Sequence, residues 1–233
     1  MLGFNLPIVS FSLYENDEST EHARGGPRMT RKPAIEDIAL DLFASEGFEG
    51  ASLGRIADEV GIRKPSIYAH FRSKEELFLS VFEQALRRKK RALFRFVGER
   101  RSDPFDDVLR GLAERLMDDY EQDAETRFLL RMSYFPPSSL HDRVMDLVNP
   151  FFEQGERGLT RLLRRPGSAE RLYPDGAREA ALAYLTILDG VLAEAIYSSR
   201  ANAARRFEAV WPVYCRGVLR PVRPDKPIHT QGE

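Results

Sequence analysis

Apolar residues recur at helical spacing along almost the whole chain from residue 33 onward. Ile35, Ile38, Ala39, Leu42 and Phe43 show the i, i+3, i+4, i+7, i+8 pattern of an amphipathic helix. No stretch alternates apolar and polar residues for long enough to predict a strand. The chain is therefore expected to be all-α. The same periodicity predicts further helices near residues 53–60, 63–71, 74–94, 104–121, 125–135, 138–164, 175–198 and 202–219.

Capping residues mark where the first helices start and stop. Gly47 suits the end of the first helix, and Ser52 is placed to cap the second. Gly61 closes the second helix after barely two turns. Ser73 and Glu76 have the spacing of a capping box, which launches a long fourth helix.

The charge distribution changes this picture more than the net charge of −1 does. Residues 28–101 carry 16 Lys and Arg against 11 Asp and Glu, whereas residues 102–233 carry 18 against 21. The basic excess therefore lies on the segment with the short helices. Such an excess is compatible with a nucleic-acid partner, although solvated surfaces carry similar runs.

The second and third helices, with a tight turn around Gly61, have the organisation of a helix-turn-helix. In such a unit the second helix presents its exposed edge to the major groove of DNA. Ile67 and Phe71 are expected to point inward and to leave the polar edge free. The candidate DNA-binding residues, on that edge and at the two capped helix starts, are Ser52, Arg63, Lys64, Pro65, Ser66, Tyr68, His70 and Lys74.

Residues 34–78 resemble the DNA-binding domain of the tetracycline-repressor (TetR) family. The features that carry the resemblance co-occur at fixed spacing: LFxxxGF at 42–48, SLxxIAxxVGI at 52–62, then SIYxHF and SKEEL. The resemblance implies a homodimeric bacterial transcriptional regulator, usually a repressor, which a small ligand releases from a palindromic operator. One departure is Arg63, where many members have Ser or Thr; arginine cannot cap the third helix in that way.

The resemblance implies a division of the chain into a DNA-binding domain at 29–78 and a helical ligand-binding and dimerisation domain at 79–220. It also implies that the last two long helices form the dimer interface. The residues expected there are Leu192, Ile196, Phe207, Trp211 and Tyr214. Core packing within one subunit is the competing explanation for these apolar stripes.

A ligand pocket is expected between the fourth and eighth helices. Its candidate residues are Phe128, Met132, Phe135, Phe152, Tyr184 and Asp189, with Tyr134 and Phe151 nearby. Aromatic residues at helical spacing also occur in plain cores. Asp189 is the most informative of the set, because it interrupts an apolar run and a buried carboxylate needs a partner. That partner is an arginine or a backbone amide in one reading, and a cationic or hydroxylated ligand in the other.

Enzyme motifs are missing from the sequence. It contains no GxSxG, P-loop, dinucleotide fingerprint or HExxH, and its four histidines are widely separated. We therefore expect no catalysis, metal or cofactor. Two alternatives keep a helical fold: a regulator that senses redox state through Cys215, and a helical interaction module without operator binding.

The two ends of the chain have a different composition from the periodic part. Residues 1–28 include a polar, glycine-containing stretch, and residues 221–233 are rich in proline, so both are expected to be disordered. If translation starts at Met29, residues 1–28 are not part of the protein. In the competing interpretation these residues form a flexible arm that contacts DNA. With one cysteine and no membrane-spanning run, a cytoplasmic protein is expected.

Overall fold

The computed structural model describes residues 31–173 and 176–220, and in these ranges every regular element is helical. The all-α prediction is therefore confirmed, and the expectations for residues 1–28 and 221–233 lie outside the described part. The elements are α1 (Arg31–Gly50), α2 (Leu53–Val60), α3 (Lys64–Tyr68), α4 (Lys74–Glu99), α5 (Phe105–Gln122), α6 (Ala124–Tyr134), the 3-10 helix η1 (Ser138–Leu140), α7 (His141–Leu163), α8 (Ser168–Arg171), α9 (Ala177–Tyr197) and α10 (Arg200–Val218).

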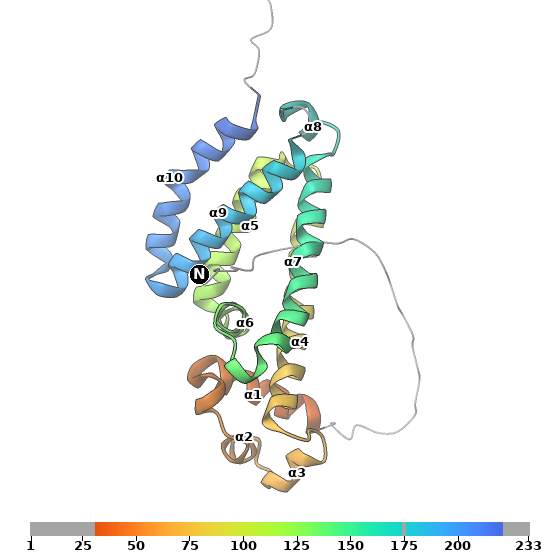
Figure 1. Cartoon of the computed structure of the whole chain (residues 1–233), viewed down its shortest axis with the longest axis vertical. Helices are drawn as coiled ribbons and strands as arrows, with labels where there is room; N and C mark the ends of the chain where they lie inside the picture. Colours follow the sequence, from red (N-terminus) through yellow and green to blue (C-terminus); the bar gives the residue numbers. More distant parts are fainter. Residues whose placement is uncertain (1–30, 174–175, 221–233) are drawn as a thin grey trace, which may run out of the picture.

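The helices α1, α2 and α3, with the first turns of α4, form a small unit at one end of the molecule, here called the head (Figure 1). Helix α2 begins and ends where the sequence predicts, whereas α3 ends at Tyr68, three residues before its expected end at residue 71. The Ser52 hydroxyl accepts a hydrogen bond from the Arg55 N–H at 3.2 Å, and Gly61 closes α2 in the left-handed conformation with φ of 72°. The turn this glycine permits brings α3 back across α2.

Helix α4 joins the head to the rest of the molecule, here called the body (Figure 1). The predicted capping box starts it: Ser73 Oγ accepts from the Glu76 N–H at 3.2 Å, and the Glu76 carboxylate accepts from the Arg72 N–H at 2.7 Å. The helix runs continuously to Glu99 and packs on α1, α5, α6 and α7.

The core of the body lies between α5, α9 and α10, with α7 against the other side of α9. Three large aromatic residues fix how these helices pack. The Tyr184 hydroxyl donates to the Leu109 carbonyl at 2.7 Å, and the Tyr214 hydroxyl donates to the Ala180 carbonyl at 3.0 Å. The Trp211 ring contacts both of their rings. Because both hydroxyls are satisfied, these rings are buried without a polar penalty.

Helix α6 connects the two parts through a shared apolar core. In Figure 1 it lies between the head and the α5, α9 and α10 helices, and is seen nearly end-on. Phe128 of α6 is fully buried against Phe43, Phe78 and Phe82, with ring centres 5.5–6.2 Å apart. The core of the head therefore extends past residue 78, the expected domain boundary, into α6 and α7.

The structure differs from the predicted helices in three local features. Helix α1 continues to Gly50 across a kink at Gly47, which has φ of 75°, instead of ending there. A one-turn helix, α8, lies within the loop expected between α7 and α9. Asp123 and Ser199, which the sequence analysis did not single out, cap α6 and α10.

Helix α9 is long and apolar enough to cross a membrane by length and composition, and in the described residues it alone has this property. In the structure 44% of its most apolar window is buried inside the protein. Core helices of this kind are apolar on several sides for packing reasons.

Candidate nucleic-acid interface

Helix α3 is held to the head by its apolar face and leaves its polar edge in solvent. Ile67 and Phe71 are buried, as predicted, against α1, α2 and α4. Around them Lys64, Pro65, Tyr68 and His70 are exposed, and Ser66 is half-buried. Tyr68 is a large aromatic side chain, and 51% of its surface is exposed. Packing within the head does not explain this exposure. The five-residue helix thus presents one compact polar edge.

Cations flank this edge on both sides. Arg63 and Lys64 stand at the start of α3, and Arg72 follows its end; all three are exposed, and none forms an ion pair with another described residue. Arg55, at the start of α2, is instead paired with Glu46 at 2.5 Å. Unpaired cations beside an exposed helix edge are suited to neutralise DNA phosphates.

Arg72 was not among the predicted residues, although the sequence contained a signal for it. It is the first residue after the buried Phe71 and precedes the N-cap of α4. A cation at that position extends the basic edge of α3 by one side chain. Arg63, as expected from its chemistry, provides no side-chain cap for α3.

Ser52 is exposed at the start of α2, where its hydroxyl caps the helix. The capping bond uses the hydroxyl oxygen as an acceptor, so its O–H remains able to donate to a phosphate. The phosphate contact expected at this helix start therefore remains a prediction.

The structure gives Lys74 contacts within the head. Its ammonium group donates to the Phe48 carbonyl at 2.7 Å and to the Ala51 carbonyl at 3.1 Å, and it lies 4.2 Å from the centre of the Phe48 ring. These contacts turn the side chain toward the end of α1 and satisfy carbonyls left free by the helix terminus. In this structure Lys74 therefore ties α4 to α1, and these contacts compete with the phosphate contact expected of it.

Replacing Lys74 with methionine keeps the apolar stem and removes the ammonium group. We expect the free energy of unfolding to fall by about 1–3 kcal/mol, because two carbonyls lose a charged donor, and the salt dependence of DNA binding to stay unchanged. Urea unfolding and DNA titrations at two salt concentrations measure both quantities. If the variant instead showed a smaller salt dependence of DNA binding and unchanged stability, the result would support the phosphate contact expected of Lys74.

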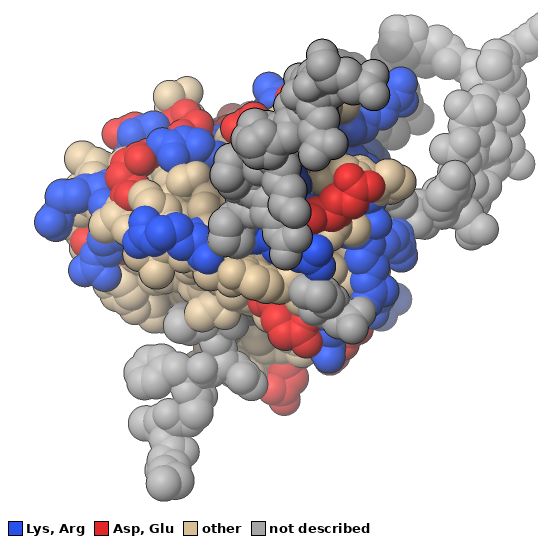
Figure 2. Space-filling view, turned by 90° about the horizontal axis from the view of Figure 1, so that it is seen from above, with Lys and Arg blue, Asp and Glu red and all other residues tan. Residues whose placement is uncertain are grey.

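The opposite end of the molecule has a different surface. Viewed from that end, basic and acidic side chains lie side by side over the coloured part of the face (Figure 2). Several of the basic groups in this region are paired, such as Arg171 with Asp106 at 2.7 Å. Such alternation favours a solvated surface rather than a DNA-binding one.

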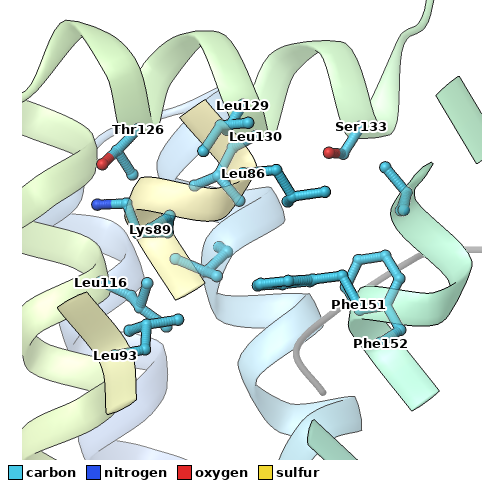
Figure 3. Close-up of a pocket in the computed structure, with 12 residues that line it drawn as sticks. Leu86, Lys89, Leu93, Leu116, Thr126, Leu129, Leu130, Ser133, Phe151 and Phe152 are labelled. Atoms are coloured by element: carbon cyan, nitrogen blue, oxygen red, sulfur yellow. The ribbon is translucent and has the colours of Figure 1, made fainter. Parts of the chain in front are cut away.

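A small apolar cavity of about 40 Å³ lies in the body between α4, α5, α6, α7 and α9 (Figure 3). Leucine side chains and the rings of Phe151 and Phe152 form most of its wall. Its polar members are Lys89, Thr126 and Ser133, with Lys89 on the side opposite Ser133 and Phe151. This volume holds only a few water molecules.

Lys89 is the one charged residue in the cavity lining, and it was not among the predicted pocket residues. It is only 9% exposed and forms ion pairs with Asp119 at 3.1 Å and Asp123 at 3.5 Å. The sequence did contain a signal that this lysine is buried, because Lys89 falls between Leu86 and Leu93 on the apolar side of α4. A cation at such a position must be paired when buried.

Most of the predicted pocket residues lie elsewhere. Phe152 lines the cavity as expected, and so does Phe151. Phe128 is packed in the shared core and Tyr184 in the body core, so both are structural. Met132 packs against the core of the head.

The remaining two candidates lie where α6 and α9 meet. Phe135 is half exposed and contacts Tyr197 edge to face, with ring centres 5.7 Å apart. Asp189 lies beside Tyr134, whose hydroxyl donates to the Asp189 backbone carbonyl at 3.3 Å. Burial raises the pKa of Asp189, and a hydrogen bond from Tyr134 lowers it by a smaller amount. The resulting pKa is about 8.

The structure also corrects the predicted dimer residues. Leu192, Phe207 and Trp211 are buried within the chain, and Leu192 lines the cavity. Tyr214 is buried as well, but it also lines the groove on the outer side of these helices. They hold α9 and α10 together, as the competing core reading had it. Ile196 is half-buried at the edge of this packing.

The outer side of α9 and α10 instead carries an open groove of about 400 Å³. Its wall is mostly small and apolar, and includes Ala183, Ile187, Val210, Val213 and Gly217. Leu182 and Val213 are 40% and 56% exposed on the same helices. Apolar residues exposed along two helices favour contact with another protein surface.

Comparison with known proteins connects these features. Residues 35–81, which include α2, α3 and the start of α4, match the family described as bacterial regulatory proteins, tetR family. ComR, a transcriptional repressor of Escherichia coli, is 31% identical over 74 residues, which are 32% of this chain and 35% of ComR. FasR, a transcriptional activator of Mycolicibacterium smegmatis, is 38% identical over 58 residues, 25% of this chain and 26% of FasR.

The sequence matches therefore span about a third or less of these relatives, whereas the fold match is much wider. SCO4454, a TetR-family regulator from Streptomyces coelicolor, superposes with a TM-score of 0.63 over 81% of this chain and 95% of its own, at 20% identity. At that identity the likeness establishes the fold alone. The head is therefore similar in sequence to the DNA-binding part of tetR-family regulators, and the fold of the head and body together is similar to that of a solved TetR-family regulator.

Proposed function

We propose that the chain is a homodimeric repressor that binds a palindromic DNA operator through α3 and is released by a small molecule. The observation that carries the DNA-binding part is the exposed edge of α3, with Tyr68 in solvent and with Arg63, Lys64 and Arg72 in no ion pair with a described residue. In this arrangement Lys64 and Ser66 reach base edges or phosphates, and Tyr68 donates to a phosphate.

The groove on α9 and α10 supports a homodimer. A two-fold contact uses the same surface on both subunits, and exposed small apolar residues allow close helix approach. Two α3 helices related by such an axis read half-sites one turn of B-DNA apart, about 34–36 Å. Every substitution on α3 is then present twice in each complex.

The cavity beside α4 supports regulation by an effector. Its 40 Å³ is far below the roughly 300 Å³ of a typical small-molecule site. An effector therefore stabilises a different, wider arrangement of α4, α6 and α7. Because α4 leads into the head, that arrangement changes the separation of the two α3 helices, within the limit set by the effector's differential affinity.

An anisotropy titration on the DNA upstream of its own gene tests the regulator proposal, with random DNA as the control, at two salt concentrations. We expect tight binding to one palindromic site and weak binding to random DNA. Equal, weak and salt-sensitive binding to both would favour the alternative of a helical interaction module. A promoter fusion then separates repression from activation, the activity named for FasR.

Replacing Lys64 with alanine should weaken operator binding by about tenfold or more, because a phosphate or base contact is lost in each subunit. If the contact is to a phosphate, the salt slope should also fall by about 1 per lost contact. Arg164, exposed at the end of α7 and in no ion pair with a described residue, is the matched control, since its removal takes away the same charge far from α3. Equal loss in both variants would show a nonspecific charge effect.

Redox sensing through Cys215 is the less favoured alternative. Burial raises the pKa of this thiol above its ordinary value, which lowers the thiolate fraction available for oxidation. The sequence contains no second cysteine to form a disulfide within the chain. A cytoplasmic location follows from the proposed DNA partner.

A further inference from the structure

A cleft separates the last turns of α4 from the last turns of α7, at the end of the body away from the head (Figure 1). Its walls are apolar and come from both helices, with Phe94 and Val97 on α4 and Leu159 and Leu162 on α7. Its volume is about 60 Å³. The cleft shares no lining residue with the apolar cavity or with the groove on α9 and α10, so the proposed dimer leaves it accessible.

Two glycines leave this cleft open. Gly98 on α4 and Gly158 on α7 line it without contributing a side chain. A Cβ atom added at Gly98 would meet no other part of the protein within 4 Å. Packing between helices therefore does not require glycine at this position, and a larger residue here would occupy open space.

Two arginines, one helical turn apart on α7, stand beside the apolar walls. Arg161 is exposed and Arg165 is half-buried, and neither side chain forms an ion pair or a hydrogen bond with another described residue. Glu156, the last acidic residue of α7, is paired with Arg178 at 2.8 Å. Cations near the end of a helix also interact with its dipole, but that effect needs no apolar cleft beside them.

The α4 side of the cleft adds positive charge. The Lys90 ammonium lies 5.8 Å from the centre of the Phe94 ring, which forms part of the wall. Arg95 is exposed on the same helix and forms no ion pair with a described residue. Glu99, the one acidic residue in the last turns of α4, is paired with Arg100 at 3.8 Å. The surroundings of the cleft therefore favour an anion.

The volume of the cleft limits the apolar part of a ligand. An apolar cavity of about 150 Å³ holds one benzene ring. On that scale 60 Å³ excludes a ring and holds a chain of about two or three carbon atoms. Guanidinium groups bind carboxylates through pairs of charged hydrogen bonds, which gives the arginines a suitable partner.

We propose that this cleft binds a short-chain aliphatic carboxylate, with its alkyl chain between α4 and α7 and its carboxylate at Arg161 and Arg165. The ligand contacts both helices, so it binds most tightly at one spacing between them. Because α4 leads into the head, such a ligand is of the effector class invoked above. The inference rests on the proposed function for this regulatory role only, and binding itself is measured without DNA.

A ligand-observed NMR titration of the full chain with butanoate, at constant ionic strength, tests the site. We expect an affinity on the order of millimolar, since so small a ligand makes few contacts. Butanamide, which has the same shape and no charge, should bind at least about tenfold more weakly. Acetate keeps the charge but lacks two methylene groups, so it should also bind about tenfold more weakly.

Substitutions separate the two parts of the site. Arg165→Gln should weaken butanoate binding about tenfold, whereas Arg165→Lys keeps the charge and should retain part of the binding. Gly98→Leu should weaken binding about tenfold or more by filling the cleft, without a clash at its Cβ atom. Arg164→Gln is the matched control and should bind butanoate as wild type does, because Arg164 is exposed beside Arg165 and does not line the cleft.

The proposal is overturned if the wild-type chain does not bind butanoate, if butanamide binds as tightly, or if Gly98→Leu binds butanoate as wild type does. Equal losses in Arg164→Gln and Arg165→Gln would also overturn it, because they would show a diffuse attraction of anions. Butanoate binding that leaves the operator complex unchanged would support the site and remove only its role as effector. Failure to bind an operator would contradict the proposed function alone.

Discussion

Replacing Phe128 with alanine is expected to lower the free energy of unfolding by about 3–5 kcal/mol, the range for truncating a buried phenylalanine. Phe128 is fully buried, and its ring meets those of Phe43, Phe78 and Phe82 from the head. The cavity left behind would open between α1, α4 and α6, which continuous helices cannot easily collapse to fill.

The same substitution should destabilise both parts of the molecule together. Trp211, the only tryptophan, reports on the body through its fluorescence, while far-ultraviolet circular dichroism follows all helices. We expect the two signals to shift to lower urea concentration in one coincident transition. Phe135→Ala is the control, because its side chain is half exposed and should cost less than about 1 kcal/mol. A loss below about 1 kcal/mol for Phe128→Ala would contradict the shared core.

Replacing Asp189 with asparagine should change how stability depends on pH. Burial raises the pKa of Asp189 to about 8 in the folded protein, against 3.8 in the unfolded chain. The folded state therefore binds this proton more tightly, so its stability is highest at low pH and falls as pH rises from about 4 toward 8. The slope from this one group is at most about 1.4 kcal/mol per pH unit.

Asparagine has nearly the same shape and does not titrate, so Asp189→Asn should lose this slope and be more stable than wild type at pH 8. Urea unfolding of both proteins between pH 5 and 8 measures the difference. Asp142→Asn should follow wild type, because Asp142 is exposed. Parallel curves for wild type and Asp189→Asn would show that the carboxylate is solvated.

Local sequence patterns predicted the helices well because each carries its own signal. Ser52, Gly61 and the Ser73 capping box place the starts of α2, α3 and α4 within one residue. Within the head, the division of α3 into a buried side with Ile67 and an exposed side with Tyr68 also follows from helical spacing. These features depend on neighbours in the chain.

The side-chain roles that spacing alone leaves open depend on contacts between distant segments. Whether Trp211 faces a partner subunit or α9 cannot be read from its spacing, because both arrangements use the same apolar stripe. Tyr184 and Phe128 were expected near a ligand but fill cores whose other half comes from α5 and from the head. Lys74 has the position of a phosphate ligand, and only the approach of α1 gives its ammonium two carbonyls.

The shared core also bears on how the head could be exchanged between related proteins. Sequence similarity to the family profile ends at residue 81, which makes a tempting crossover point for a chimera. Yet Phe128, Leu129 and Val144 would then meet a foreign head with side chains of another shape. A graft that carries the matching α6 and the start of α7 along with the head would keep both halves of that contact from the same parent.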